Sequence, residues 1–187
     1  MDPVPFLGLE ATHNPHRWYL PIAPRLCTWH EFLFGGCGLG ASIEALERTT
    51  GRPVVWATAQ YLSYARPGSV MDIDVTVPVA GRSVTQARAI GHVGDTEILT
   101  VNAALGSRDL DAAAQMIEMP DVAPPEDCPP RLARHLGEDR DTIMRHLDLR
   151  LARGREAEDF DGTLLPGGRS ALWARVEALP DTTAAKL

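Results

Sequence analysis

The sequence is poor in cysteine, in aromatic residues and in basic residues. Its 187 residues include three cysteines, 6% aromatic residues, and 18 Lys and Arg against 25 Asp and Glu. Three scattered cysteines (Cys27, Cys37 and Cys128) do not form a disulfide framework and favour a reducing compartment. The formal net charge of −7 argues against nucleic acid as a partner and against binding to anionic lipid surfaces.

Long hydrophobic runs are absent as well. The N-terminal residues MDPVPFLGLE carry Asp2 where a signal peptide carries positive charge, and no apolar stretch is long enough to span a bilayer. We therefore expect a cytoplasmic protein with no membrane partner. His13 and His16 lack cysteine or carboxylate neighbours, so no metal site is expected. No cofactor is expected either.

Residues 37–50 (CGLGASIEALERTT) are predicted to form a helix that ends at Gly51. Glycines at the start of this helix suggest close packing against a strand or a ligand. Its apolar face is expected to hold Leu39, Ile43 and Leu46. Its charged residues are expected to be exposed: Glu44, Glu47 and Arg48.

Strands are predicted on both sides of this helix. Arg17–Ile22 is short and bounded by prolines, which is typical of an edge strand. Val54–Ala65 is apolar on both faces, which predicts a central strand covered on both sides. An antiparallel meander is expected to follow, over Val70–Val79, Ser83–Val93 and Thr96–Leu105. One helix followed by such a meander is an α+β pattern.

A proline-rich connector, Pro120–Pro130, marks the expected domain boundary. Two further strands are expected beyond it, at Arg145–Arg153 and Ser170–Ala178, and a helix is expected to begin at Asp181 or Thr182. The expected organisation is an N-terminal domain (1–119), a linker segment (120–144) and the opening strands of a second, incomplete repeat (145–187).

The segment Phe34-Gly35-Gly36-Cys37 is the first candidate for chemistry. The first N–H groups of a helix have no internal acceptor, and glycines let a ligand approach them. The N–H groups of Gly36 and Cys37 could therefore hold a thioester oxygen as it becomes an oxyanion. The alternative is that the glycines only permit a tight helix entry. For the Cys37 thiol, a buried and inert role is the better interpretation, and His30 and Glu31 are expected to be surface loop residues.

Several short motifs occur in the order found in the type II acyl-CoA thioesterases, which carry two hotdog repeats in one chain. The helix entry is Phe34-Gly35-Gly36. The later matches are Tyr61, Arg66-Pro67-Gly68, Gly81-Arg82-Ser83 and Ala103-Ala104-Leu105-Gly106. The second repeat is matched by Leu147-Asp148-Leu149-Arg150 and Leu172-Trp173-Ala174-Arg175. Over roughly residues 30–187 the chain thus resembles that family.

The resemblance implies a hotdog fold, a long helix wrapped by an antiparallel sheet, and hydrolysis of fatty acyl-CoA in fatty acid metabolism. In the family, an Asp on the second-repeat helix acts with a Thr or Ser and a Gln from later strands. The sequence ends at Leu187, a few residues into the helix expected to bear that Asp, and we expect a truncated form of a longer protein. A divergent short member is the alternative. Candidate substrate-binding residues are Phe34, Gly35, Gln60, Tyr61 and Arg66.

Single-hotdog thioesterases use a carboxylate on the helix that follows the Gly-Gly pair. Glu44 is the available candidate for such a base, although it sits one residue late, which rotates it by about 100°. A structural Glu44 with Arg48 nearby is the favoured interpretation. Two other functions stay open: an acyl-CoA-binding or assembly module without turnover, and a hotdog hydratase, whose Asp/His pair is not visible. A homodimer or a double-hotdog pairing is expected to cover the open edge of the sheet.

Overall fold

The computed structural model describes residues 6–107, 116–131, 141–156, 159, 161–163 and 166–176. The chain divides into two compact units. The first contains the described residues 6–107 and 141–143, and the second contains the described residues 116–131 and 144–176.

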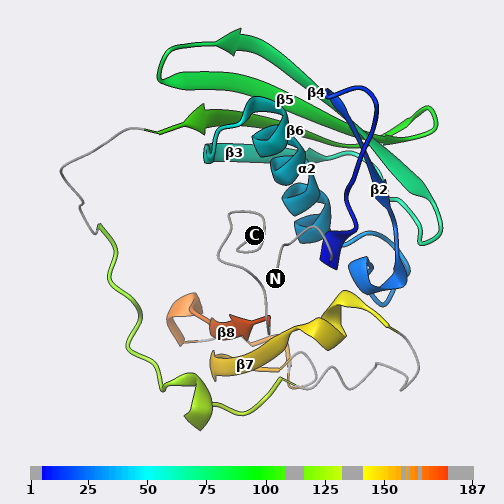
Figure 1. Ribbon diagram of the computed structural model, residues 1–187. Coiled ribbons are helices and arrows are strands. Elements are labelled where there is room, and N and C mark those ends of the chain that lie inside the picture. The colour runs from blue at the N-terminus through cyan, green and yellow to red at the C-terminus, as the bar shows by residue number, and fades with distance from the viewer. Residues whose placement is uncertain are drawn as a thin grey trace. The chain divides into compact units, whose positions relative to one another are not determined.

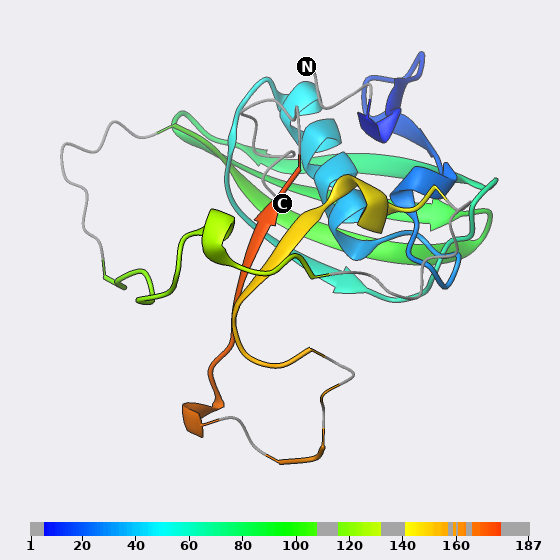
Figure 2. The ribbon, with the colours of Figure 1, turned by 90° about the horizontal axis from the view of Figure 1, so that it is seen from below.

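The first unit is one antiparallel sheet with a helix on one face (Figure 1). The strand order is β1-β2-β4-β5-β6-β3, and all neighbouring strands are antiparallel. The strands are β1 (Glu10–Ala11), β2 (Arg17–Pro21), β3 (Val54–Tyr61), β4 (Val70–Ala80), β5 (Val84–Val93) and β6 (Thr96–Gly106). Helix α2 (Gly35–Thr50) lies against the sheet and contacts strands β2 to β6 (Figure 2). This is the expected hotdog arrangement.

The core lies between α2 and one face of the sheet. Alternate residues of each strand point toward the helix from this face. Met71 and Ile73 of β4 are fully buried, as are Ile43 and Leu46 of the helix. Alternate residues of β6 are buried too: Leu99, Val101, Ala103 and Leu105. The helical spacing predicted the burial of Ile43 and Leu46 correctly, and the buried strand residues follow the period of two that is typical of strands.

Gly38 allows α2 to come close to the sheet. A Cβ atom at this position would lie 2.9 Å from Leu99 Cδ2 and 3.3 Å from Leu33 Cδ2. Both distances are shorter than ordinary carbon–carbon contacts. The expectation that glycines near the helix start serve close packing is confirmed for Gly38.

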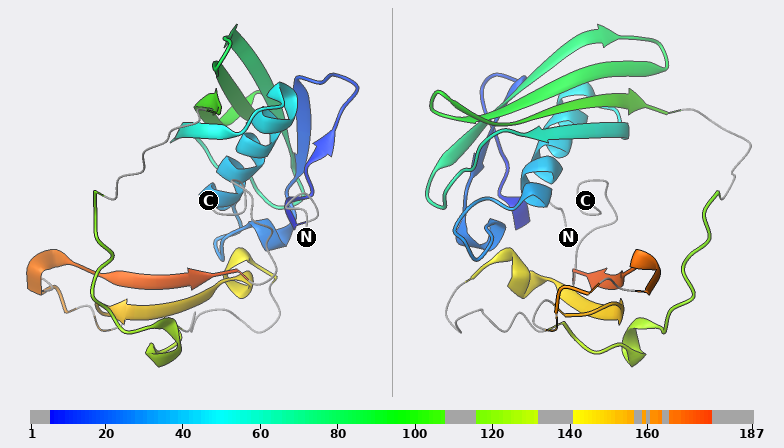
Figure 3. Two further views of the ribbon diagram at one scale, coloured as in Figure 1. Left: turned by 60° about the vertical axis from the view of Figure 1, so that its left-hand side comes forward. Right: turned by 180° about the vertical axis from the view of Figure 1, so that it is seen from behind.

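Strand β3 is not the central strand that its sequence predicts. It is the last strand in the order and pairs with β6, and no other strand of the described residues lies along its outer edge (Figure 3). Val55 is 67% exposed and Trp56 is 57% exposed. Apolar residues on both faces of a strand indicate that both faces are buried in the functional protein. They do not specify whether the same chain or a partner buries them. The chain crosses the sheet between β3 and β4, and strands β4, β5 and β6 then pair in chain order as the expected antiparallel meander.

The helix differs from its prediction at both the start and the middle. It begins at Gly35, two residues earlier than expected, and ends as predicted at Gly51, which adopts the left-handed conformation (φ 65°). Glu44, expected on the exposed face, is only 7% exposed. Its Oε1 lies 2.5 Å from Nε of Arg48, so the carboxylate is buried as one half of an ion pair. Glu47 accepts a hydrogen bond from the N–H of Val54 (2.7 Å) and so joins the helix to the start of β3.

Charged residues join β2, β4 and β5. Arg17 binds the Asp74 carboxylate through two hydrogen bonds, of 2.6 and 2.9 Å. His92 Nε2 lies 3.0 Å from Asp74 Oδ2, and its Nδ1 lies 2.9 Å from the Gly94 carbonyl oxygen. Because both ring nitrogens face acceptors, the imidazole satisfies both only when it is protonated. Partial burial lowers the pKa of His92, but these hydrogen bonds outweigh it and the pKa is raised. His92 is partly buried.

The second unit contains a two-stranded antiparallel sheet. Its strands are β7 (Asp148–Arg153) and β8 (Ala171–Arg175), inside the two segments predicted to be strands. The end of the proline-rich connector pairs with β7: Arg131 donates its N–H to Leu149 O (2.7 Å). The helix expected to begin at Asp181 or Thr182 lies outside the described residues.

Candidate functional site

The start of α2 presents backbone N–H groups at the end of the core. Phe34 is the residue before the helix, with an extended backbone (φ −66°, ψ 132°), and it provides no side-chain cap. The first helical hydrogen bond runs from the Gly38 N–H to Phe34 O (3.1 Å). The N–H groups of Gly35, Gly36 and Cys37 therefore have no acceptor four residues earlier in the helix. The first turn contains no acidic residue, so its positive dipole end is not neutralised by a side chain of that turn.

Tyr61 lies at this helix start. Its hydroxyl donates a hydrogen bond to the Gly35 carbonyl (3.1 Å). A Cβ atom at Gly35 would lie 3.1 Å from Tyr61 Cε1, so the ring packs directly against the glycine. Burial raises the pKa of Tyr61, which keeps the phenol protonated as the donor. The sequence placed Phe34, Gly35 and Tyr61 in one site, and the fold brings them together.

The Cys37 side chain does not supply a nucleophile. It is buried, and burial raises the pKa of its thiol to about 12. A thiolate is the reactive form of cysteine, and its population is very small at this pKa. The contribution of Cys37 to a site is therefore its backbone N–H. Ser42, one turn further on, donates its hydroxyl to Gly38 O (2.9 Å) and serves the helix itself.

Glu44 lies far from the helix start. Eight residues separate it from Gly36, which corresponds to about 12 Å along the helix axis. A general base must come within hydrogen-bonding reach of the water that it activates. In this geometry Glu44 and the N–H groups of Gly36 and Cys37 of the same chain do not share one reacting atom. The ion pair with Arg48 gives Glu44 a structural role.

Gln60 and Arg66 flank the site in different ways. Gln60 is exposed on the edge strand β3, next to Tyr61. Arg66 is exposed, and its guanidinium carbon lies 5.4 Å from the ring centroid of Tyr64, a cation–π contact. The fold thus places Arg66 beside an aromatic ring. No sequence motif indicated Tyr64.

Aromatic side chains gather around this contact. Phe32 and Tyr64 have ring centroids 6.5 Å apart, and His30 stacks on Phe32 at 5.9 Å with an interplanar angle of 2°. Trp29 lies 4.2 Å from His30. The density of aromatic residues in Trp29–Phe34 (WHEFLF), within a sequence only 6% aromatic, was the available signal.

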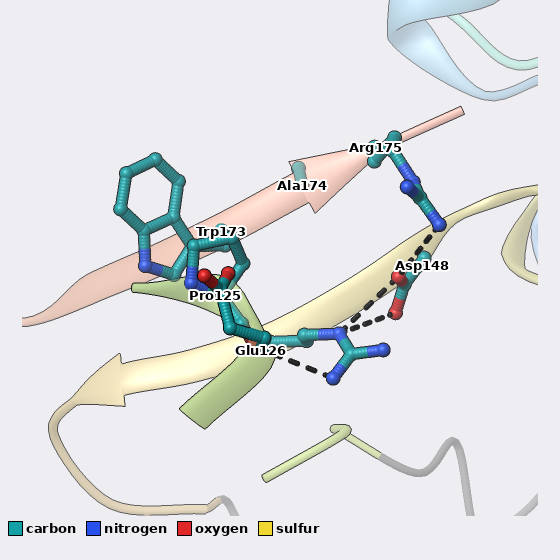
Figure 4. Close-up of a pocket in the computed structure, with 7 residues that line it drawn as sticks. Pro125, Glu126, Asp148, Trp173, Ala174 and Arg175 are labelled. Carbon is teal, nitrogen blue, oxygen red and sulfur yellow. Dashed lines mark hydrogen bonds and ion pairs between the residues drawn. The ribbon is translucent and has the colours of Figure 1, made fainter. Parts of the chain in front are cut away.

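A pocket of about 360 Å³ in the second unit is a separate candidate (Figure 4). Several of its polar groups already have partners. Arg150 pairs with Asp148 (3.2 Å), and Arg175 approaches the same carboxylate (3.6 Å). The Trp173 indole N–H donates to Ala123 O (2.9 Å). With these donors and cations engaged, the pocket does not define a ligand site as clearly as the start of α2 does.

The described residues contain no group of three or more His, Cys, Asp or Glu side chains arranged to hold a metal ion. They also contain no helix of the length and apolarity needed to cross a membrane.

Comparison with solved structures places this architecture among hotdog proteins. A putative thioesterase from Novosphingobium aromaticivorans is 28% identical with a TM-score of 0.80, and the match covers 95% of this chain and 68% of that protein. The acyl-CoA thioesterase II TesB2 from Mycobacterium marinum is 20% identical with a TM-score of 0.69, covering 97% and 63%. A hotdog-fold protein of unknown function from Alicyclobacillus acidocaldarius is 18% identical with a TM-score of 0.74, covering 94% and 64%.

Fold and comparisons together define a hotdog-fold protein. Its structural neighbours include TesB-type acyl-CoA thioesterase II proteins and putative thioesterases, as the motif resemblance predicted. The chain spans about two thirds of the length of the neighbours described above. A scan against protein-family models found no match, and neither did a search of the curated proteins.

Proposed function

We propose that this protein acts on acyl-CoA thioesters and hydrolyses them to a free acid and CoA. The observation that carries the proposal is the uncapped first turn of α2, whose N–H groups at Gly36 and Cys37 point out of the helix end. In the reaction a water attacks the thioester carbonyl, the carbonyl oxygen becomes an oxyanion, and the CoA thiolate leaves after the tetrahedral intermediate collapses. Donors aimed at the developing oxyanion lower the barrier, by about 2.7–4 kcal/mol for one well-placed donor.

A fatty acyl group, a place in fatty acid metabolism and a cytoplasmic location belong to the same proposal. So does the division into an N-terminal hotdog domain (1–119), a linker (120–144) and the opening strands of a second repeat (145–187).

A non-catalytic acyl-CoA-binding or assembly module is the second candidate. The observation that favours it is the state of Glu44, which is buried, paired with Arg48, and about 12 Å along the helix from Gly36. A binding module needs the N–H donors but no general base. The two candidates therefore differ only in turnover.

A hydrolysis assay separates the two candidates. The full chain is incubated with a series of acyl-CoA thioesters of increasing chain length, and the released thiol is measured against the spontaneous rate. Binding is measured on the same series by calorimetry. Release above the spontaneous rate supports the thioesterase, saturable binding without release supports the module, and no binding at any chain length contradicts both.

Pairing through β3 is part of the proposal. The outer edge of β3 has no strand partner among the described residues, and Val55 and Trp56 on it are exposed. An edge of this kind, with unpaired backbone groups, is a template for another strand. We expect a homodimer or a double-hotdog assembly, and a monodisperse monomer by light scattering would contradict this.

A further inference from the structure

The aromatic cluster beside the helix start has the chemistry of a nucleotide site. It consists of His30, Phe32, Tyr64 and Arg66, with Trp29 at its outer end, and is called the aromatic cluster below. Tyr64 is 62% exposed and Trp29 is 48% exposed. A run of ring contacts connects these residues, from Trp29 through His30 and Phe32 to Tyr64. Exposed and adjacent rings of this kind present faces on which a planar base can stack.

The cluster also carries a cation without a carboxylate partner. Arg66 makes the cation–π contact with Tyr64, and no described residue forms an ion pair with it. A guanidinium offers several N–H donors, and one contact with a ring face leaves them open to phosphate oxygens. Aromatic ring faces can stack on a planar base, and a guanidinium without a carboxylate partner can bind phosphate. Together they suit a ligand in which an aromatic base is linked to phosphate.

Two short segments hold the cluster in place. The Leu33 N–H donates to Ala65 O (2.8 Å), which ties the loop before α2 to the segment after β3. At the other end of that segment, the N–H groups of Leu62 and Ser63 donate to Ile98 O (2.9 and 3.2 Å). The loop contains a tight turn in which Glu31 adopts a positive φ of 61°, a conformation uncommon for a residue other than glycine. The rings are therefore carried on backbone fixed at both ends.

The cluster is continuous in sequence with the helix start. Phe32 is followed by Phe34 and Gly35, and Tyr64 is preceded by Tyr61, whose hydroxyl binds the Gly35 carbonyl. A CoA thioester carries its carbonyl at one end and an adenine with phosphates at the other, joined by the pantetheine arm. The same two segments thus offer a group for each end of one molecule.

The geometry points to the aromatic cluster as the site that binds the phosphorylated adenosine half of CoA. Adenine stacks on Tyr64 and Phe32, and Arg66 binds a phosphate. This inference rests on the proposed action on CoA thioesters and names the part of the chain that recognises the nucleotide. It predicts that the protein prefers CoA esters to the same esters of pantetheine alone.

The test uses the full chain and three probes: CoA, adenosine 3′,5′-bisphosphate, and an acyl-pantetheine that lacks the nucleotide. Tyr64→Ala and Arg66→Ala are each expected to raise the Kd for CoA and for the bisphosphate about tenfold, which is about 1.4 kcal/mol. Neither variant is expected to change the Kd for the acyl-pantetheine. Tyr64→Phe, which keeps the ring, is expected to bind as the parent protein does.

Arg82→Ala is the matched control, because Arg82 is an exposed arginine in the hairpin between β4 and β5. It is expected to leave all three constants unchanged, and circular dichroism checks that each variant is folded. No binding of the bisphosphate by the parent protein, or unchanged binding in both alanine variants, overturns the inference. Bisphosphate binding that CoA does not displace also overturns it, because the site would then serve a free nucleotide.

The proposed function fails in a different way. If the parent protein hydrolyses acyl-pantetheine but does not bind the bisphosphate, the thioesterase proposal stands and the inference about the aromatic cluster fails. The protein could instead bind the bisphosphate through Tyr64 and Arg66, release it when CoA is added, and hydrolyse no ester. In that case the nucleotide site is supported and the proposed hydrolysis is wrong. If Tyr64→Ala and Arg66→Ala change the oligomeric state but leave nucleotide binding unchanged, the aromatic cluster is a surface between copies of the chain. That result would overturn the inference.

Discussion

Removing Arg48 is expected to destabilise the protein through the carboxylate it leaves behind. Glu44 is buried in the helix face, and its Oε1 lies 2.5 Å from Arg48 Nε. The Arg48 side chain is 40% exposed, and the Glu44 side chain is 9% exposed. Arg48→Ala therefore takes the partner from a charge that water reaches poorly, whereas the arginine itself sits at the surface.

The two limits for such a pair bracket the expected loss. An exposed ion pair contributes about 0.2–1 kcal/mol, and breaking a fully buried pair costs about 3–5 kcal/mol. With one partner buried and the other half-exposed, we expect Arg48→Ala to lower the free energy of unfolding by about 1–3 kcal/mol. Glu44→Gln removes the charge but keeps the shape, and is expected to cost about 0.5–1.5 kcal/mol.

The double variant distinguishes this mechanism from a simple loss of contacts. Once Glu44→Gln has removed the charge, the further change Arg48→Ala no longer strands a carboxylate. Arg48→Ala should therefore cost less stability in the Glu44→Gln background than in the parent protein, and the coupling energy should be about 1 kcal/mol or more. Any other contribution of Arg48 cancels in the cycle.

Urea unfolding of the four proteins, followed by circular dichroism, gives these energies from the midpoints at a constant slope. Arg82→Ala controls for the loss of an exposed arginine and should change stability by no more than about 0.5 kcal/mol. Strict additivity of the two substitutions would refute the buried-charge argument. If Glu44→Gln instead keeps its stability and loses acyl-CoA hydrolysis by more than about tenfold, Glu44 acts in the chemistry and its structural interpretation is wrong.

Three further predictions concern other parts of the first unit. Burial lowers the pKa of His92, but its hydrogen bonds to the Gly94 carbonyl and to Asp74 outweigh burial and raise the pKa. The contribution of His92 to stability is therefore present below the unfolded pKa of about 6.5 and is lost as pH rises through the folded value. The difference in melting temperature between the parent and His92→Gln should be larger at pH 5.5 than at pH 8.5, and the opposite trend would contradict this prediction. With a pKa of about 12, Cys37 should resist a thiol reagent at pH 8 until the protein is unfolded, and rapid labelling of the folded protein would show that the thiol is accessible. Gly106 has a φ of 147° and a Cβ there would lie 2.1 Å from Ser83 O, so Gly106→Ala should destabilise by roughly 1–3 kcal/mol in urea unfolding, and an unchanged midpoint would contradict the geometry.

Local patterns predicted the buried side of the fold well. The spacing of Ile43 and Leu46 in α2 placed these residues in the core, because the period of the pattern matches the geometry of a helix. Gly51 ended the helix as expected, since glycine adopts the left-handed conformation without a Cβ clash. The Gly35-Gly36 helix start and the neighbouring Tyr61 were also found from motif order.

Features that depend on which elements become neighbours were not predicted. Val54–Tyr61 looks like a central strand, but only the sheet order shows that it lies at the edge and exposes Val55 and Trp56. Helical spacing put Glu44 on a solvent face, but it did not reveal how far the packing around α2 extends. The contact of Arg66 with Tyr64 needs the chain to turn after β3, which no periodic pattern records.

The sequence by itself determined the order and type of the elements, the apolar faces that meet in the core, and the glycines that open and close the helix. These depend on periodicity and on backbone freedom, which are properties of neighbouring residues. Only the tertiary structure decided which strand is left at the edge, which carboxylate is buried, and which rings and cation meet beside the helix start. Those outcomes depend on contacts between segments far apart in the chain, and no local pattern encodes them.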